Sequence, residues 1–205
     1  MYNRFFKRLL DILLSGIGII ILGIPMIVVS VMVKLDSKGP VLFKQKRVGI
    51  HKTYFNILKF RSMPIDTPKD MPTHQLKNAE DRLSKFEKAI RKYSIDELPQ
   101  LFNIFVGQMS IVGPRPALYN QYDLIEERDK YGANDVRPGL TGWAQINGRD
   151  ELPIDVKAGY DGEYVDRLSF AFDCKCVWGT IFKVINHEGV VEGGTGAMNT
   201  TESSD

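Results

Sequence analysis

Two adjacent carboxylates, Asp96 and Glu97, are the side chains of this sequence best placed to do chemistry. They come just before an apolar stretch that begins at Leu98, which places them at the start of a predicted helix. A helix N-terminus attracts phosphate groups, and an aspartate there can attack phosphorus as a nucleophile. Consecutive helical residues point about 100° apart, so the glutamate would have a different task, such as binding Mg²⁺. The pair indicates carboxylate chemistry on a phosphorylated substrate.

A structural alternative explains the same two acids. Ser94 and Glu97 have the spacing of a helix capping box, in which a serine and an acid three residues later bond each other's backbone amides. In that arrangement both acids only complement the helix dipole. The motif alone does not decide between the two interpretations.

Arg115 stands between two prolines in the sequence GPRP at 113–116. Prolines fix the backbone angle φ, so the loop holds this arginine stiffly, and a guanidinium fork suits phosphate oxygens. An ordinary surface arginine in a turn is the alternative. Four further cations are candidates for phosphate binding: Lys59, Arg91, Arg137 and Arg149.

The elements that must position these residues begin with an uncharged apolar run of 22 residues at 12–33. A membrane-spanning helix needs roughly 20 such residues. A cleaved signal peptide would have a shorter apolar region, about 7–15 residues, followed by a small-residue cleavage site, which this run lacks. Pro25 lies near the centre of the run, where it removes a backbone hydrogen bond and breaks the helix. The run therefore predicts an uncleaved membrane anchor with a break at Pro25.

Both flanks of the apolar run are basic, with Arg4, Lys7 and Arg8 before it and Lys34 and Lys38 after it. Basic flanks prefer the cytoplasm. A spanning helix would place one flank outside the cell, whereas a re-entrant hairpin keeps both inside. The charge pattern favours the re-entrant hairpin and leaves the spanning helix as the alternative.

The chain divides into three predicted parts. Residues 1–38 form an interfacial stretch and the re-entrant membrane helix, residues 39–189 form a cytoplasmic catalytic domain, and residues 190–205 form a disordered tail rich in glycine, serine and threonine. The net charge of +2 is too small to predict nucleic-acid binding. The 2 cysteines make no disulfide framework, and the 3 scattered histidines make no zinc site.

The catalytic domain is predicted to be α+β and mainly helical. Short strands at 41–43 and 54–60 flank a turn that contains Gly49. Apolar residues at helical spacing within 98–105 indicate a helix that either packs in the core or faces a membrane interface. Other segments are predicted as a loop at 63–81, helices at 86–93, 118–130 and 170–186, and an irregular stretch at 138–148.

Four sequence blocks occur in order: KFRSM at 59–63, SIDELPQLFN at 94–103, GQMSIVGPRP at 107–116 and VRPGLTGWAQINGR at 136–149. With these blocks the chain resembles the small monotopic phosphoglycosyl transferases of the bacterial sugar transferase family. The resemblance extends over residues 4–189. It implies a mainly helical fold with a small β-hairpin, a re-entrant membrane helix and helices that lie along the membrane.

The resemblance implies an activity. A sugar 1-phosphate would pass from a UDP-sugar to undecaprenyl phosphate, with release of UMP, at the cytoplasmic face of a bacterial inner membrane. Asp96 would be the nucleophile that forms a phosphosugar-aspartyl intermediate, and Glu97 would hold Mg²⁺. The reaction would initiate surface glycan assembly, and a loose likeness to capsule-type members at 117–121 points weakly to an N-acetylated amino sugar. Membrane lipids are further expected partners, nucleic acid is not, and homo-oligomer formation stays open.

The resemblance also implies a set of substrate-binding residues. Arg91 and Arg115 match family arginines near the phosphates, while Lys59 and Asp173 match other polar residues around the site. The fourth block adds three more residues to the predicted set: Arg137, Gln145 and Arg149.

One departure from the family pattern concerns the membrane helix. Family members often carry Ser-Pro at the break, whereas this chain has Ile24 before Pro25 and Gly23 before that. The missing hydroxyl would have bonded backbone carbonyls, and Gly23 is expected to supply the bend instead.

Two other function classes remain. A membrane-tethered glycosyltransferase would move the sugar without its phosphate and release UDP rather than UMP. A non-catalytic scaffold would keep the fold alone, and the intact Asp96, Glu97 and Arg115 argue against it.

Overall fold

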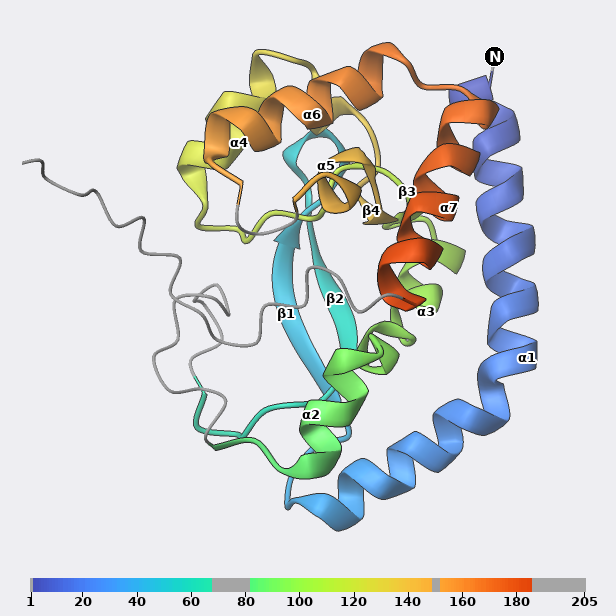
Figure 1. The fold of residues 1–205 in the computed structure, drawn as a ribbon, viewed down its shortest axis with the longest axis vertical. Helices are drawn as coiled ribbons and strands as arrows, with labels where there is room; N and C mark the ends of the chain where they lie inside the picture. Colours follow the sequence, from blue (N-terminus) through green and yellow to red (C-terminus); the bar gives the residue numbers. More distant parts are fainter. Residues whose placement is uncertain (1, 68–81, 149–151, 186–205) are drawn as a thin grey trace, which may run out of the picture.

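The structure, a computed structural model, describes residues 2–67, 82–148 and 152–185. It is a mainly helical α+β fold, as predicted. A short π-helical turn, η1 (Tyr2–Phe6), leads into the long helix α1 (Lys7–Asp36), which runs along one side of the molecule beside a central hairpin of β1 (Leu42–Val48) and β2 (Tyr54–Phe60) (Figure 1). The other elements are η2 (Ile50–Lys52), α2 (Lys85–Lys92), η5 (Ile95–Glu97), α3 (Gln100–Phe105), β3 (Ser110–Val112), α4 (Tyr122–Asp129), η6 (Ala133–Asp135), β4 (Gly139–Thr141), α5 (Trp143–Ile146), α6 (Ile154–Asp166) and α7 (Phe170–Ile185).

The first part of helix α1 turns polar residues inward and apolar residues outward. Lys7, Asp11 and Ser15 follow one another at four-residue spacing, share one helix face and are buried against the domain. Ile20 and Ile24 are 80% and 76% exposed. Among the described residues α1 is the one helix long and apolar enough to cross a membrane by length and composition. This reversed amphipathicity is typical of a helix whose outer surface meets lipid rather than water.

Pro25 lies inside α1, and the helix stays continuous through it. Figure 1 shows α1 bending below its midpoint, so that its second part turns under the domain. A proline within a helix removes one backbone hydrogen bond and is a common cause of such a bend. The predicted break is therefore a bend within one helix, not two helices joined by a turn.

The predicted β-hairpin is confirmed, with β1 longer than expected. The strands pair antiparallel from Leu42 opposite Phe60 to Val48 opposite Tyr54. The connection beyond Gly49 passes through His51, in the left-handed region at φ 52°. The hairpin brings the end of β2, where the first sequence block begins, close to α2 in the lower part of the view (Figure 1).

A small parallel sheet of β3 and β4 was not predicted, because three-residue strands leave no periodicity to detect. Ser110 pairs with Gly139, and Val112 pairs with Thr141. The approach is close, since a Cβ atom added to Gly139 would lie 2.1 Å from the backbone nitrogen of Gly113. This sheet holds the third and fourth sequence blocks side by side.

The helices agree with the sequence in part. The helices predicted at 86–93, 118–130 and 170–186 correspond to α2, a shorter α4 and α7, whereas α6 was missed and α5 lies in the stretch predicted to be irregular. In α3 the polar Gln100 and Asn103 are buried, while Phe102 and Phe105 are exposed. The predicted apolar stripe is therefore divided: Phe102 and Phe105 reach the surface, while Leu98 and Leu101 pack against buried clusters.

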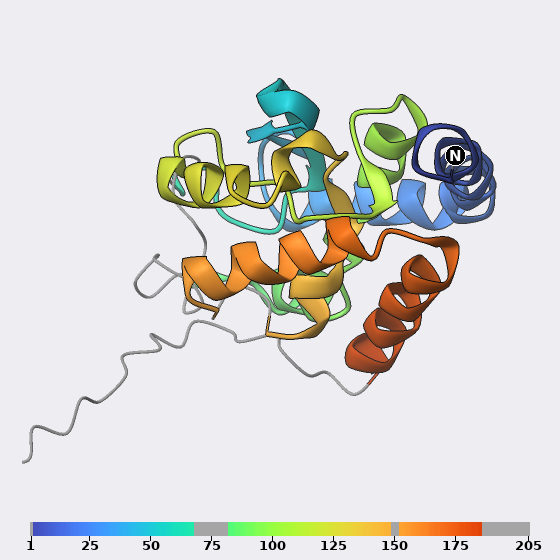
Figure 2. The same ribbon diagram turned by 90° about the horizontal axis from the view of Figure 1, so that it is seen from above.

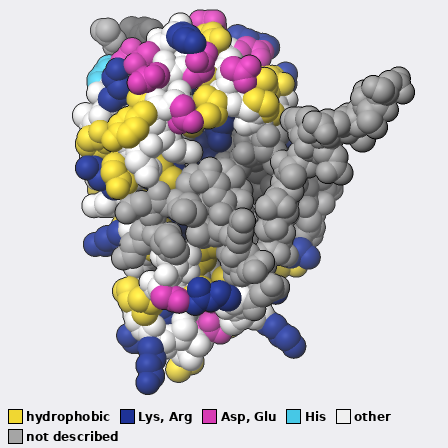
Figure 3. All heavy atoms as spheres, turned by 90° about the vertical axis from the view of Figure 1, so that its left-hand side faces the viewer, with side chains coloured by type: hydrophobic (Ala, Val, Ile, Leu, Met, Phe, Trp, Pro, Cys, Tyr) yellow, Lys and Arg dark blue, Asp and Glu magenta, His cyan; other side chains and the backbone are white. Residues whose placement is uncertain are grey.

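Helix α7 lies beside the first part of α1 in both views (Figures 1 and 2). Its Trp178 and Phe182 are each 62% exposed. Apolar side chains of α1, α3 and α7 thus reach the surface, whereas the side of the molecule away from α1 carries acidic and basic side chains over its upper part (Figure 3). The predicted tail at 190–205 lies outside the described residues.

Candidate active site

Asp96 and Glu97 lie in the single turn η5, between α2 and α3. The capping-box interpretation of this turn is wrong: Ser94 adopts a left-handed conformation (φ 54°, ψ 24°), and its side chain caps nothing. The capping box lies one helix earlier, where Ser84 and Glu87 bond each other's backbone amides at the start of α2. The two adjacent acids are therefore not used to cap a helix.

Glu97 is held by two cations. Its Oε1 atom accepts a hydrogen bond from Lys59 Nζ at 2.7 Å and another from Arg115 Nη2 at 3.3 Å. Burial of this carboxyl favours its neutral form, but the charges of Lys59 and Arg115 outweigh that effect and lower the pKa of Glu97 well below its usual value. Glu97 is therefore ionised at neutral pH and joins β2 to the arginine loop at 113–116.

Asp96 has a different environment from its neighbour. The residue is 7% exposed, and the hydroxyl of Ser62 lies 3.5 Å from its Oδ2 atom. Burial, aided by the charge of Glu97, raises the pKa of Asp96 to about 6 against the opposing charges of Lys59, Arg91 and Arg115. No ion pair to Asp96 is found in the described parts of the chain. A buried carboxylate without a directly paired cation keeps its electrons available for attack.

Two other arginines hold the backbone of the arginine loop through hydrogen bonds to its carbonyl oxygens. Arg128 donates from Nη2 to the carbonyl oxygen of Arg115 at 3.0 Å, and Arg47 donates from Nη1 to that of Pro116 at 2.9 Å. Arg128 is itself buried in an ion pair with Asp161, at 2.6 Å. These contacts hold the loop so that the Arg115 side chain reaches Glu97.

Sequence reasoning missed the residues that support the site. Ser62 lies within the first block, so that block was the signal for it. Arg128 lies within the helix predicted at 118–130 but was not singled out, and its burial depends on Asp161 from α6, a helix the sequence did not predict.

The site could supply one protein ligand for Mg²⁺, the carboxylate of Glu97. Among the described residues, no group of three or more histidine, cysteine or acidic side chains could hold a metal. Glu97 uses Oε1 for both cations, and no hydrogen bond to its Oε2 is found among those residues. Mg²⁺ is commonly held by one or two carboxylates together with water and substrate phosphates, which matches this donor set.

Arg91 lies near Asp96, and Gln145 lies near the base of the arginine loop. Arg91 is in the last turn of α2, close enough that its charge lowers the pKa of Asp96. Gln145 is 7% exposed, and neither atom of its amide group has a partner in the described part of the chain. Its Oε1 would lie 2.6 Å from a Cβ added to Gly142, which itself packs on Gly113 at the base of the arginine loop. The predicted Arg149 lies outside the described residues.

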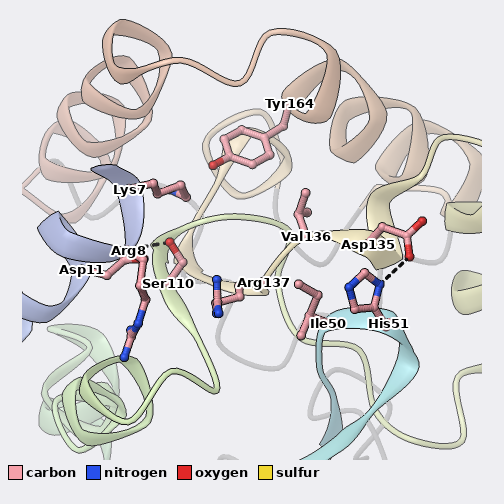
Figure 4. Close-up of a pocket in the computed structure, with 10 residues that line it drawn as sticks. All are labelled: Lys7, Arg8, Asp11, Ile50, His51, Ser110, Asp135, Val136, Arg137 and Tyr164. Carbon is pink, nitrogen blue, oxygen red and sulfur yellow. Dashed lines mark hydrogen bonds and ion pairs between the residues drawn. The ribbon is translucent and has the colours of Figure 1, made fainter. Parts of the chain in front are cut away.

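Arg137 and Asp173 lie elsewhere. Arg137 donates from Nε to the carbonyl oxygen of Gly107 and lines a cavity of about 520 Å³ with residues of α1, η2 and α6 (Figure 4). Asp173 accepts hydrogen bonds from Lys7 and Tyr2 through Oδ2, both at 2.6 Å. These contacts join α7 to the start of α1. The structure does not bring either residue to Asp96, and their substrate-binding roles stay predictions.

The comparisons with known proteins agree with this geometry. The sequence model described as bacterial sugar transferase matches residues 2–187. The chain belongs to the bacterial sugar transferase family. The uncharacterized sugar transferase EpsL of Bacillus subtilis (strain 168) is 40% identical over 184 residues, which cover 90% of this chain and 89% of that relative.

Two further family members have names that state a reaction. The UDP-glucose:undecaprenyl-phosphate glucose-1-phosphate transferase of Escherichia coli (strain K12) is 38% identical, over 88% of this chain and 40% of that protein. The UDP-N-acetylgalactosamine-undecaprenyl-phosphate N-acetylgalactosaminephosphotransferase of Aeromonas hydrophila is 36% identical, over 90% of this chain and 45% of that protein. The chain thus spans less than half the length of these two relatives.

Proposed function

We propose that this protein is a phosphoglycosyl transferase, which moves a sugar 1-phosphate from a UDP-sugar to undecaprenyl phosphate and so initiates glycan assembly. The observation that carries the proposal is the contrast between the two adjacent acids. Glu97 is tied to Lys59 and Arg115, while Asp96 is buried beside them and has no ion-paired partner among the described residues. The family relatives that act on undecaprenyl phosphate support the choice of acceptor.

The first half-reaction forms a covalent intermediate. An ionised oxygen of Asp96 attacks the phosphorus that carries the sugar, and the bond from that phosphorus to the bridging oxygen of the diphosphate breaks. UMP leaves with the bridging oxygen and the bonding electron pair. The attack needs no proton transfer, because Asp96 acts as a carboxylate.

The second half-reaction regenerates the enzyme. A phosphate oxygen of the lipid attacks the same phosphorus, and the Asp96 oxygen leaves as a carboxylate. Lys59 and Arg115 are placed to balance negative charge beside Glu97, and Arg115 presents a rigid fork that suits phosphate oxygens. When bound, Mg²⁺ would neutralise charge on the diphosphate, with Glu97 as its protein ligand.

The protein is proposed to sit on one face of the membrane. Both ends of α1 contact the same domain, through Lys7 with Asp173 at one end and through Val33 with Arg61 at the other. A helix that crossed a hydrocarbon core of about 30 Å would place these charged partners on opposite sides. We therefore propose a re-entrant anchor whose bend at Pro25 lies deepest, with the domain at the cytoplasmic face, where its basic flanks belong.

The released nucleotide tests the reaction. Purified protein in detergent, given undecaprenyl phosphate, Mg²⁺ and a panel of UDP-sugars that includes UDP-glucose and UDP-N-acetylgalactosamine, should release UMP with one or more of them. Release of UDP instead would assign the chain to the glycosyltransferases. Binding without turnover of any donor would favour a scaffold.

A further inference from the structure

Arg61 directly follows β2, the strand that contributes Lys59 to the candidate site, and ties the end of that strand to the end of the membrane helix. The residue is 4% exposed. Its Nη2 donates to the carbonyl oxygens of Val33 at 3.3 Å and Ser37 at 2.6 Å, and its Nη1 donates to that of Lys38 at 3.1 Å. The last carbonyls of a helix have no partner within it, and a cation there also interacts favourably with the helix dipole. Arg61 therefore caps the C-terminal end of α1 from a different element.

The surrounding chain is shaped around this guanidinium. Gly39 has a positive φ of 131°, and a Cβ atom added there would lie 2.2 Å from Arg61 Nη1. The hydroxyl of Ser37 accepts a further hydrogen bond from Nη2 at 2.7 Å. Any larger residue at position 39 would displace Arg61 from the helix end, so the contact depends on glycine there.

Of the residues next to Arg61, two contact the candidate carboxylates and one packs against the membrane helix. Lys59 bonds Glu97 at 2.7 Å, and Ser62 lies 3.5 Å from Asp96. Phe60, between Lys59 and Arg61, packs in a buried cluster with Met26 and Val33 of α1. The second part of α1 therefore packs against the same short segment of chain that contacts both carboxylates.

The two substrates approach the site from different phases. A nucleotide sugar is soluble and arrives from water, whereas the phosphate of a polyprenyl lipid stays at the membrane surface. We propose that Arg61 is a positioning residue that fixes the second part of α1 against β2 and so sets the position of Asp96 relative to the lipid phosphate. This inference rests on the proposed function and adds a residue that acts in its second half-reaction.

Two substitutions at this position test the inference. With Arg61→Met, formation of the sugar-phosphate adduct from UDP-sugar alone should stay within about threefold of wild type. Discharge of that adduct by undecaprenyl phosphate in lipid nanodiscs should slow about tenfold or more, with a raised KM for the lipid, because small misplacements of reacting groups are costly. Arg61→Lys keeps the charge without the planar fork and should be intermediate, and Ser37→Ala should show a smaller change in the same direction.

A stability-matched control separates positioning from unfolding. Leu124→Ala removes a buried side chain in a cluster away from α1, and at a matched melting temperature it should leave the ratio of the two half-reactions unchanged. If Arg61→Met slows both half-reactions equally, or leaves the lipid step unchanged, the positioning role of Arg61 is wrong and the proposed function still stands. Absence of any adduct in a wild-type protein that still releases UMP would overturn the covalent mechanism, and this role in its second half-reaction with it, whereas absence of UMP release would overturn the proposed function itself.

Discussion

Lys59 Nζ lies 2.7 Å from Glu97 Oε1, and this contact joins the end of the β-hairpin to the turn that carries both candidate carboxylates. Because Lys59 bonds Glu97 rather than Asp96, the two adjacent acids differ in pKa and in role. Glu97 is the fixed anion of the site, and Asp96 is the candidate nucleophile.

Asp96→Asn should abolish turnover and at the same time stabilise the protein. The pKa of Asp96 is raised to about 6 in the folded state, above the usual value of about 3.9. Its stabilising contribution is therefore full at low pH and is lost as the pH rises through about 6. At pH 7.5 the substitution should raise the free energy of unfolding by on the order of 1–3 kcal/mol. Thermal melting at pH 7.5 and pH 4 checks this, since the gain should vanish at the lower pH.

Glu97→Gln should also abolish turnover, but with the opposite effect on stability. The pKa of Glu97 is lowered by Lys59 and Arg115, so its ionised form stabilises the fold above the usual pKa of about 4.3. The substitution leaves both cations without their carboxylate and should lower the free energy of unfolding at pH 7.5 by about 1–3 kcal/mol. A melting temperature at or above that of the wild type would contradict the assignment of Glu97 as the fixed anion.

The rate of adduct formation should rise with pH through about 6 as Asp96 loses its proton. Lys59→Met removes a charge that lowers the pKa of Asp96, so the midpoint of this rise should move to higher pH. Quenched adduct formation between pH 5 and 9, in wild type and variant, measures the shift. A midpoint that stays in place or moves to lower pH would show that a different group controls the rate.

Gly113→Ala should reduce turnover about tenfold or more, because the added Cβ would lie 2.4 Å from the carbonyl oxygen of Arg137 and would displace the arginine loop. Gly159→Ala is the matched control: nothing lies within 4 Å of its added Cβ on α6. That control should keep full turnover and gain helix stability of up to about 1 kcal/mol. Equal activity of the two variants would mean that the loop position is unimportant.

Both ends of α1 should be reached only from the cytoplasm. Single cysteines at Asn3 and Ser37, with Cys174 and Cys176 replaced, should resist a membrane-impermeant thiol reagent until the cells are opened. Pro25→Ala should straighten the helix and give a mixed topology, since the basic N-terminal flank resists export. If the protein that keeps Pro25 is labelled at position 3 in intact cells, the helix spans the membrane.

The sequence predicted what local chemistry determines. The hairpin follows from alternating apolar strands around Gly49, and α1 follows from 22 uncharged residues. The contacts of Lys59 with Glu97, and of Arg128 with Asp161, join residues 38 and 33 positions apart. Local periodicity carries no information on such pairs, so the sequence named Lys59 as a candidate cation without indicating its contact with Glu97, and it did not name Arg128.

One interpretation based on sequence spacing, the capping box at Ser94 and Glu97, was wrong. Ser94 and Glu97 have capping-box spacing, but Ser94 is left-handed and caps nothing. The same spacing forms a capping box at Ser84 and Glu87, where a helix follows directly. The difference lies in backbone conformation, which residue types alone do not reveal.

The central claim is that Asp96 becomes covalently linked to the sugar phosphate. Wild-type protein is incubated without lipid, with Mg²⁺ and a UDP-sugar that it accepts as a substrate. It should gain the mass of one sugar phosphate. Fragmentation should place the added mass on Asp96, and undecaprenyl phosphate should then remove it. No adduct should form with Asp96→Asn. A quenched wild-type sample that releases UMP only when the lipid is present, and never carries the added mass, would contradict the covalent mechanism.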